Sequence, residues 1–362
     1  MTATTPIPIV DSHIHLFPES HLPSLAWYTP SEPSPLSTSH SVEQYRTATK
    51  DALTQLRGFI FLETDRLSSV SESGKHGWTH ALDEVSFLSR IARGTPIPGE
   101  GHSPDDKGLV LGIVPWAPVP GGPAELVQYM ALVKERAGSE EVWRKVCGVR
   151  YLVQDKEAGT MLQTPFIEGL KWLGRQGLTF DLGVDARQGG IWQLVEAVEM
   201  MRRVYGVEGV EEGKSVKIVI NHLCKPNLRL KSTSTEPITS NPDFTQWKTQ
   251  VTTMSHFPKT YMKLSGVFSE LPPLDPNTEP DIPSLVDALQ PWTEVIFDAF
   301  GPERVMFGSD WPVCNVGGGG NEVTWGRGRR VAEGVLKRRG LSEEERRGFW
   351  GGVAVEAYGV TV

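Results

Sequence analysis

Eight short apolar segments recur along the whole chain, and they constrain its fold more than any other feature of the sequence. They are PIPIVDSH, RGFIFLET, GLVLGIVPWA, KVCGVRYLV, GLTFDLGV, VKIVINH, YMKLSGV and RVMFGSD. Most are continuously hydrophobic rather than alternating, which is typical of parallel strands covered on both faces. Helical patterns lie between several of them, as in residues 41–56, 124–137 and 191–206. This alternation predicts βαβ units and a parallel sheet.

The number of these repeats favours a closed (β/α)8 TIM barrel over an open doubly wound sheet, within the α/β class. The 362 residues could form two domains, but no internal repeat or break in composition marks a boundary. We therefore expect residues 1–362 to form a single domain. The residues beyond the roughly 250 of a minimal barrel lie in long loops, most of which follow the C-terminal end of a strand, where barrels carry their active sites. These loops include residues 16–40, 226–243, 270–280 and 315–328.

Net charge and cysteine spacing argue against several classes of partner and of structural site. The net charge of −8 argues against a surface for duplex nucleic acid or for an anionic membrane. The three cysteines, Cys147, Cys224 and Cys314, are too widely spaced for a disulfide framework or a cysteine-rich zinc module. No signal peptide or membrane-spanning segment is evident, so we expect a cytoplasmic protein. A homo-oligomer is compatible with the sequence.

Histidine and aspartate stand at the ends of three predicted strands. His13 and His15 are two residues apart in VDSHIHLF, so their side chains leave the same face of an extended strand. Two converging imidazoles are a common way to hold a transition metal, although one could line a pocket while the other packs beneath it. His222 ends the sixth segment and Asp310 follows the eighth. Closure makes strands one and eight neighbours, so the histidine pair and Asp310 are expected to meet.

These residues carry a resemblance to a known family. With GVRYLVQ, FDLGVD, INHLCKP, RVMFGSDWPV and LSEEERRGFWGGVAVEAYG, they resemble the lactonase branch of the amidohydrolase superfamily over essentially the whole chain. Fuconolactonases and fungal enzymes of the L-rhamnono-γ-lactonase type belong to this branch. The resemblance implies hydrolysis of a sugar-acid lactone to the aldonic acid. Water would attack the ester carbonyl, with Asp310 as general base and His222 as a second catalytic residue.

The same resemblance implies further site residues. Donors to the lactone carbonyl would be Arg150 and Lys225, and Asp181 offers another polar group. Trp27 and Trp311 would form apolar walls. Simpler roles stay open: Arg150 pairing with Asp181 or Glu63, Lys225 contacting solvent, and Trp311 packing in the core.

The metal content is left open by the sequence. A single divalent ion, with zinc favoured, would be held by His13, His15 and Asp310. Members with two metals carry a lysine at the end of strand four, where this chain has Arg150, and many with one metal carry a histidine at the end of strand five, near Asp181 here. These departures argue against a two-metal site. Metal-free catalysis is an alternative, because the resemblance extends to members of the branch that do not need a metal. Within the branch's own motifs, Cys224 replaces a usual glycine and Val353 a usual asparagine.

Two other functions are compatible with the same residues or the same fold. A metal-dependent decarboxylase of the aminocarboxymuconate type would share the histidine pair and the aspartate, and a non-catalytic small-molecule-binding barrel would share the fold. No GxSxG elbow is present for a serine hydrolase, and no phosphate-binding glycine motif occurs. Cys224 lies two residues after His222, but no third group is evident that would orient such a nucleophile.

Overall fold

The eight apolar segments each form a strand. The computed structural model describes residues 6–32, 34–70, 77–206, 215–231 and 237–362. Within them all strand pairs are parallel, as the continuous hydrophobicity predicts. The strands are β1 (Ile9–Ile14), β2 (Leu56–Leu62), β3 (Val110–Val114), β4 (Gly148–Arg150), β5 (Thr179–Leu182), β6 (Lys217–Ile220), β7 (Thr260–Leu264) and β8 (Val305–Phe307).

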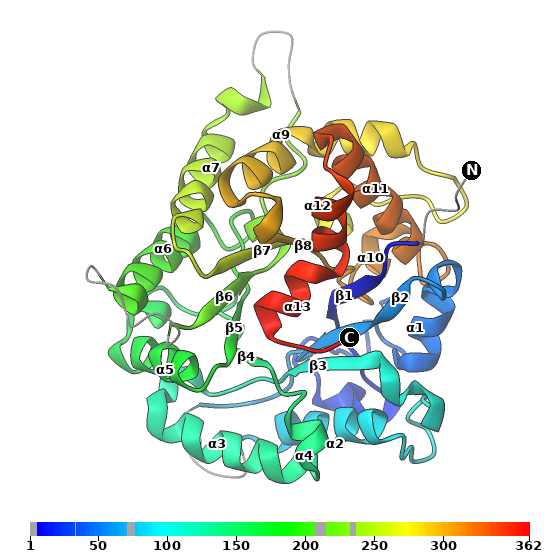
Figure 1. Ribbon diagram of the computed structural model, residues 1–362, viewed down its shortest axis with the longest axis vertical. Coiled ribbons are helices and arrows are strands. Elements are labelled where there is room, and N and C mark those ends of the chain that lie inside the picture. The colour runs from blue at the N-terminus through cyan, green and yellow to red at the C-terminus, as the bar shows by residue number, and fades with distance from the viewer. Residues whose placement is uncertain (1–5, 33, 71–76, 207–214, 232–236) are drawn as a thin grey trace.

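Backbone hydrogen bonds close these strands into a ring. The strands pair in the orders β1-β2-β3 and β4-β5-β6-β7-β8. Between β3 and β4, the Cys147 amide donates to the Ile113 carbonyl at 3.1 Å. Between β8 and β1, the His15 amide donates to the Trp311 carbonyl at 2.8 Å. The predicted TIM barrel is therefore confirmed, and the open sheet is not what forms (Figure 1).

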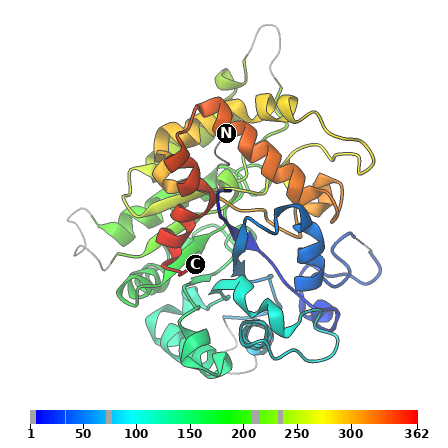
Figure 2. The same cartoon turned by 45° about the vertical axis from the view of Figure 1, so that its right-hand side comes forward.

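Helices surround the ring on its outer side (Figures 1 and 2). The helices expected over residues 124–137 and 191–206 are confirmed, and the Ser342–Glu345 capping box is present. The helices are α1 (Val42–Ala48), α2 (Thr79–Arg93), α3 (Gly122–Ala137), α4 (Glu140–Trp143), α5 (Thr164–Arg175), α6 (Trp192–Tyr205), α7 (Pro242–Ser255), α8 (Val267–Glu270), α9 (Ile282–Phe300), α10 (Asn315–Gly318), α11 (Thr324–Arg339), α12 (Glu343–Arg347) and α13 (Val353–Tyr358).

The helix expected over residues 41–56 is shorter than its pattern suggests. It ends at Ala48, and a short 3-10 turn over Lys50–Ala52 follows. Thr49 stands at the break and donates its hydroxyl to the Tyr45 carbonyl at 2.8 Å. Such back-bonding by threonine competes with the helical ladder and often bends or ends a helix.

The C-terminal helix closes the N-terminal end of the barrel. Figure 1 shows α13 lying across the centre of the ring of strands. Val353 and Tyr358 belong to the same buried apolar cluster as Val10 and Met306 of the barrel interior. This packing explains why an apolar residue is accommodated at position 353. The Tyr358 hydroxyl also donates a hydrogen bond to the Asp181 carboxylate inside the barrel.

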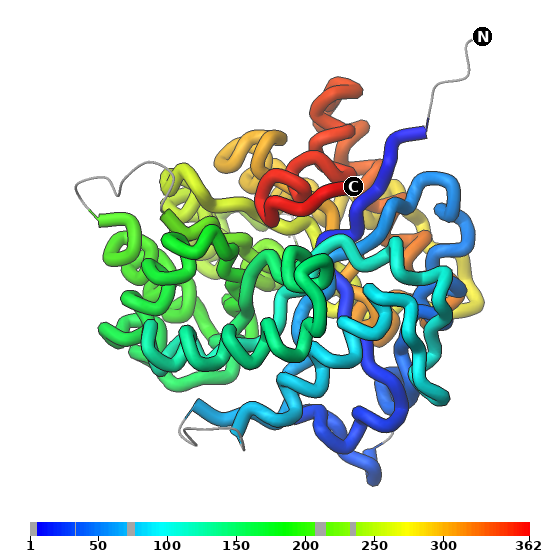
Figure 3. The backbone as a smooth tube through the Cα atoms, turned by 60° about the horizontal axis from the view of Figure 1, so that its bottom comes forward, coloured from blue at the N-terminus to red at the C-terminus, as the bar shows by residue number. Residues whose placement is uncertain are grey.

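The long loops gather at the opposite end. In Figure 3 the blue segment that follows β1 lies on the far side of the molecule from the N-terminus. Among the helices described here, none has the length and apolarity needed to cross a bilayer.

We expect Tyr358→Phe to lower the free energy of unfolding by about 1–3 kcal/mol, because it removes a donor from the buried Asp181 carboxylate. Tyr129→Phe is the matched control. In the part of the chain that the structure describes, the buried Tyr129 hydroxyl has no hydrogen-bond partner, so its loss should leave stability unchanged or raise it. Urea unfolding of both variants measures the difference, and equal losses would contradict this account.

Candidate active site

An irregularity in β1 aims two histidines into the barrel. The register of β1 on β2 shifts between Asp11 and Ile14. Val10, before the shift, packs in the barrel interior, whereas Ile14 packs in the outer core, although regular alternation would place both on one face. Bulges commonly redirect side chains beside active sites. Here the shift turns His13 and His15 inward together.

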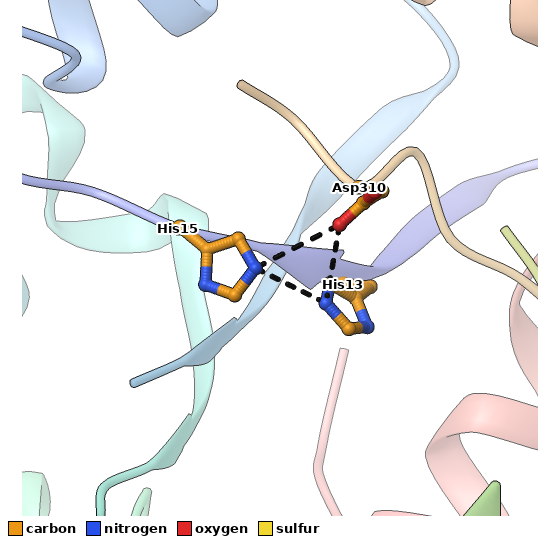
Figure 4. Close-up of side chains that lie close together, drawn as sticks. All are labelled: His13, His15 and Asp310. Carbon is orange, nitrogen blue, oxygen red and sulfur yellow. Dashed lines mark hydrogen bonds and ion pairs between the residues drawn. The ribbon is translucent and has the colours of Figure 1, made fainter. Parts of the chain in front are cut away.

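Asp310 lies against three histidines that come from two other strand ends (Figure 4 shows two of them). The His13 and His15 Nε2 atoms are 3.2 Å apart. Asp310 Oδ1 lies 3.5 Å from His13 Nε2 and 3.7 Å from His15 Nε2. His222 Nε2, at the end of β6, is also 3.7 Å from Asp310 Oδ1. The structure thus brings together the cluster expected from strands one, six and eight.

The backbone is left-handed where these side chains leave their strands. Asp310 has φ of +61°, and its amide donates to the His13 carbonyl at 2.9 Å. Residues 222–225 also have positive φ, including +61° at Cys224, which explains why a glycine is usual at that position. Non-glycine residues in this region cost about 1–3 kcal/mol each and tend to cluster at functional sites.

The end of β7 fixes the His222 ring. His222 Nδ1 lies 2.9 Å from the Ser265 hydroxyl. A Cβ atom on the neighbouring Gly266 would lie only 2.6 Å from His222 Nδ1, so glycine is required there for the ring to fit. The ring orientation that aims Nε2 at Asp310 is therefore set by both residues.

Burial favours the neutral form of His13 and His222 beside an ionised carboxylate. Burial lowers the pKa of His222 to about 3, although Asp310 opposes the shift. Burial also lowers the pKa of His13 well below its ordinary value. For Asp310, burial raises the pKa, but His222, His15 and Lys225 outweigh it and the pKa falls below its ordinary value. At neutral pH an ionised Asp310 therefore lies beside the neutral rings of His13 and His222.

A cavity of about 300 Å³ opens over this cluster. His15, His222 and Asp310 form its floor. Of the other expected site residues, Arg150, Lys225 and Trp27 line it, and the Trp27 indole is fixed by a 3.1 Å hydrogen bond to the Thr64 carbonyl. The remaining lining residues are Phe17, Leu36, Glu63, Thr64, Asp65, Leu152, Gln154, Gln188, Ser269, Glu270, Pro312 and Val313.

Two residues expected to contact substrate lie elsewhere, and this corrects the sequence interpretation. Trp311 is fully buried in the core, where its ring packs against Tyr45 and its indole donates to Asn321 at 2.7 Å. The left-handed turn at Asp310 directs the following side chain away from the cavity. Asp181 is fully buried outside the cavity lining, where its carboxylate accepts from Lys263 and from the Tyr358 hydroxyl.

Lys263 is a charged residue of the site that the sequence reasoning missed. It lies on β7, fully buried, with Nζ 3.0 Å from Asp181 Oδ2 and 3.3 Å from His13 Nδ1. Burial lowers its pKa to about 8, although Asp181 opposes the shift. A lysine in the middle of the apolar run YMKLSGV was the available signal, because an unpaired cation is not buried in a strand.

The donor atoms of His13, His15 and Asp310 fit a divalent ion. They lie within 4.8 Å of one another. His15 Nδ1 faces the Leu62 and Glu63 carbonyls at 3.1 and 2.9 Å, which places the ring proton on Nδ1 and leaves Nε2 free to coordinate. His13 can bind the ion only under one condition. Its Nδ1 faces the Lys263 amine, so coordination through Nε2 requires that amine to be neutral or displaced.

Comparison with known proteins places this geometry in a family. The family described as Amidohydrolase matches residues 115–360. An L-rhamnono-gamma-lactonase of Scheffersomyces stipitis is 34% identical over 354 residues, which cover 97% of this chain and 98% of that protein. An L-fucono-1,5-lactonase of Burkholderia multivorans is 27% identical over 60% of this chain and 64% of its own length.

A solved structure shows the same fold. An amidohydrolase from Burkholderia multivorans with bound zinc superposes with a TM-score of 0.68 at 22% identity, covering 98% of this chain and all of that one. The family match spans more than half of the chain, and the Scheffersomyces relative is similar along nearly its whole length. The chain belongs to the amidohydrolase family.

Proposed function

We propose that the protein hydrolyses an uncharged lactone of a sugar acid, of the L-rhamnono-γ-lactone kind, to the open aldonic acid. One observation carries the proposal: an ionised Asp310 carboxylate lies beside the neutral His222 ring in the lining of a cavity of about 300 Å³. Such a carboxylate can accept a proton from water. Similarity over nearly the whole chain to a protein named L-rhamnono-gamma-lactonase supports the choice of substrate.

The reaction needs one proton to be moved twice. Asp310 takes a proton from the attacking water as the new bond to the carbonyl carbon forms. The ring C–O bond then breaks, and Asp310 returns the proton to the departing alkoxide oxygen. Arg150, Lys225 and His222 line the cavity and would donate to the carbonyl oxygen as it becomes negative. A divalent ion held by His13, His15 and Asp310 would add Lewis-acid polarisation of that carbonyl.

The charges around the cavity favour a neutral substrate. Among the described lining residues, two are cations, Arg150 and Lys225, and four are acids. Lys225 Nζ faces the Asp185 carboxylate at 3.9 Å, and Arg150 faces Glu63 at 3.5 Å. Burial raises the pKa of Glu63 to about 8, although Arg150 opposes the shift, yet the other acids still outnumber the cations. A substrate that carries carboxylates would gain no net attraction, which disfavours the decarboxylase alternative.

Part of the cavity lining is apolar. The apolar part of the lining includes Phe17, Trp27, Leu36, Pro312 and Val313, and Gln154 and Gln188 offer amide groups to the same cavity. A deoxy-sugar lactone presents the same combination, with a methyl group at one end and hydroxyls around the ring. The lining therefore supports a deoxy-sugar substrate.

We expect Asp310→Asn to lower kcat by about 10²–10⁴, because it removes the general base. A pH-indicator assay over a panel of neutral aldonolactones, with carboxylate-bearing lactones beside them, measures the loss. Asp65→Asn is the matched control, since it changes a carboxylate of the same cavity away from the floor, and it should stay within tenfold of wild type. If wild type opens no lactone with or without zinc, the proposed function is wrong.

We expect the purified protein to bind one zinc ion per chain and chelator to remove both the ion and most of the activity. His15→Asn should abolish binding, because His15 is the ligand whose ring is already oriented. His256→Asn, which changes an exposed histidine, should keep it. Metal content and zinc titration give the readout independently of turnover. Full activity without bound metal would leave polarisation of the carbonyl to Arg150, Lys225 and His222.

Glu63 gives the expected pH dependence of stability. Its pKa is about 8 in the folded protein against an ordinary value of 4.5. Between these values the folded state keeps a proton that the unfolded state has lost, so stability falls as the pH rises through this window. Relative to Glu63→Gln, wild type should lose at least ~1.4 kcal/mol from acid to alkaline pH, the equivalent of one pKa unit. Chemical unfolding measures both profiles, and parallel curves would contradict the assignment.

A further inference from the structure

Asp11 is a buried carboxylate that the proposed reaction does not use. It lies on β1, two residues before His13, with no exposed surface. Oδ1 accepts a hydrogen bond from the Ser309 amide at 2.8 Å. Oδ2 accepts from the Tyr45 hydroxyl at 3.0 Å and from the Trp325 indole at 2.9 Å. The donors thus come from the end of β8, from α1 and from α11.

The Ser309 contact ties Asp11 to the turn that carries Asp310. The amide of Ser309 is held by the Asp11 side chain, and the next amide, that of Asp310, is held by the His13 carbonyl at 2.9 Å. Two consecutive amides before and at Asp310 are therefore bonded to β1. Asp310 has φ of +61°, a conformation that non-glycine residues keep only when their surroundings impose it.

The two oxygens of Asp11 have separate tasks. Oδ1 faces the turn of Asp310, and Oδ2 faces the surrounding helices. An ionised carboxylate accepts on both sides, whereas an asparagine amide has one accepting oxygen and one donating nitrogen. Asparagine at this position would therefore bring its amide nitrogen against a donor on one side or the other.

We propose that Asp11 is a positioning residue, which holds the Ser309 amide and so places the Asp310 carboxylate against His13, His15 and His222. Asp11 lies outside the cavity lining, so it acts through Asp310 and does not touch substrate. As far as it concerns turnover, this inference rests on the proposed function. The alternative is a purely structural role, in which Asp11 only anchors α1 and α11 to the barrel through Tyr45 and Trp325.

Kinetics separates these roles. Asp11→Asn should lower kcat at least tenfold with KM within twofold of wild type, because the base moves while the cavity walls stay. Tyr45→Phe removes a donor on the helix side only and should keep both constants within twofold. Unchanged kcat in Asp11→Asn, or an equal loss in Tyr45→Phe, would overturn the proposal. If Asp11→Asn does not fold, Asp11→Glu, which displaces the carboxylate by one methylene, must show the same loss of kcat alone.

Amide hydrogen exchange tests the placement without any substrate. Peptides covering residues 308–312 should exchange faster in Asp11→Asn than in wild type, and at the wild-type rate in Tyr45→Phe. If wild type opens no lactone, the proposed function fails, and exchange alone decides the role of Asp11. Unchanged exchange in Asp11→Asn would refute the positioning role whatever the activity shows.

Discussion

The backbone hydrogen bonds between the end of β8 and β1 hold both the barrel and its site. The Asp310 amide donates to the His13 carbonyl, and the His15 amide donates to the Trp311 carbonyl. These bonds close the ring of strands, and the same bonds place the carboxylate beside two imidazoles. The fold and the candidate catalytic cluster are therefore not separable at this junction, and a change that loosens it acts on both.

A chain of buried polar groups links this junction to the opposite end of the barrel. Tyr358 of the C-terminal helix donates to Asp181, Asp181 accepts from Lys263, and Lys263 faces His13 Nδ1. Burying an ion pair is costly unless its remaining hydrogen bonds are made, and removing one partner leaves an uncompensated charge. Helix α13 thus does more than cover an apolar core, because its Tyr358 donates to the buried Asp181 carboxylate beside Lys263.

Much of this arrangement could be predicted from the sequence, for identifiable reasons. Hydrophobic runs locate parallel strands, and closure then forces the ends of strands one and eight together, which is why His13, His15 and Asp310 were expected to meet. The burial of Trp311 and Asp181 could not be decided from the sequence, because neither the left-handed turn at Asp310 nor the pairing of Asp181 with Lys263 and Tyr358 shows in a strand's periodicity. Lys263 could have been predicted as a buried, paired cation, because it is a charged residue within the apolar run YMKLSGV.

The charge balance of the cavity suits the direction of the proposed reaction. A lactone enters neutral and leaves as a carboxylate, so the site must hold the first without retaining the second. Lys225 already faces the Asp185 carboxylate, and the acids of the described lining outnumber its cations, so the finished product gains little attraction. In the proposed reaction the carbonyl oxygen becomes negative only in passing, and Arg150 lines the same cavity. The same cation can therefore stabilise the transition state more than the product, which is the condition for turnover.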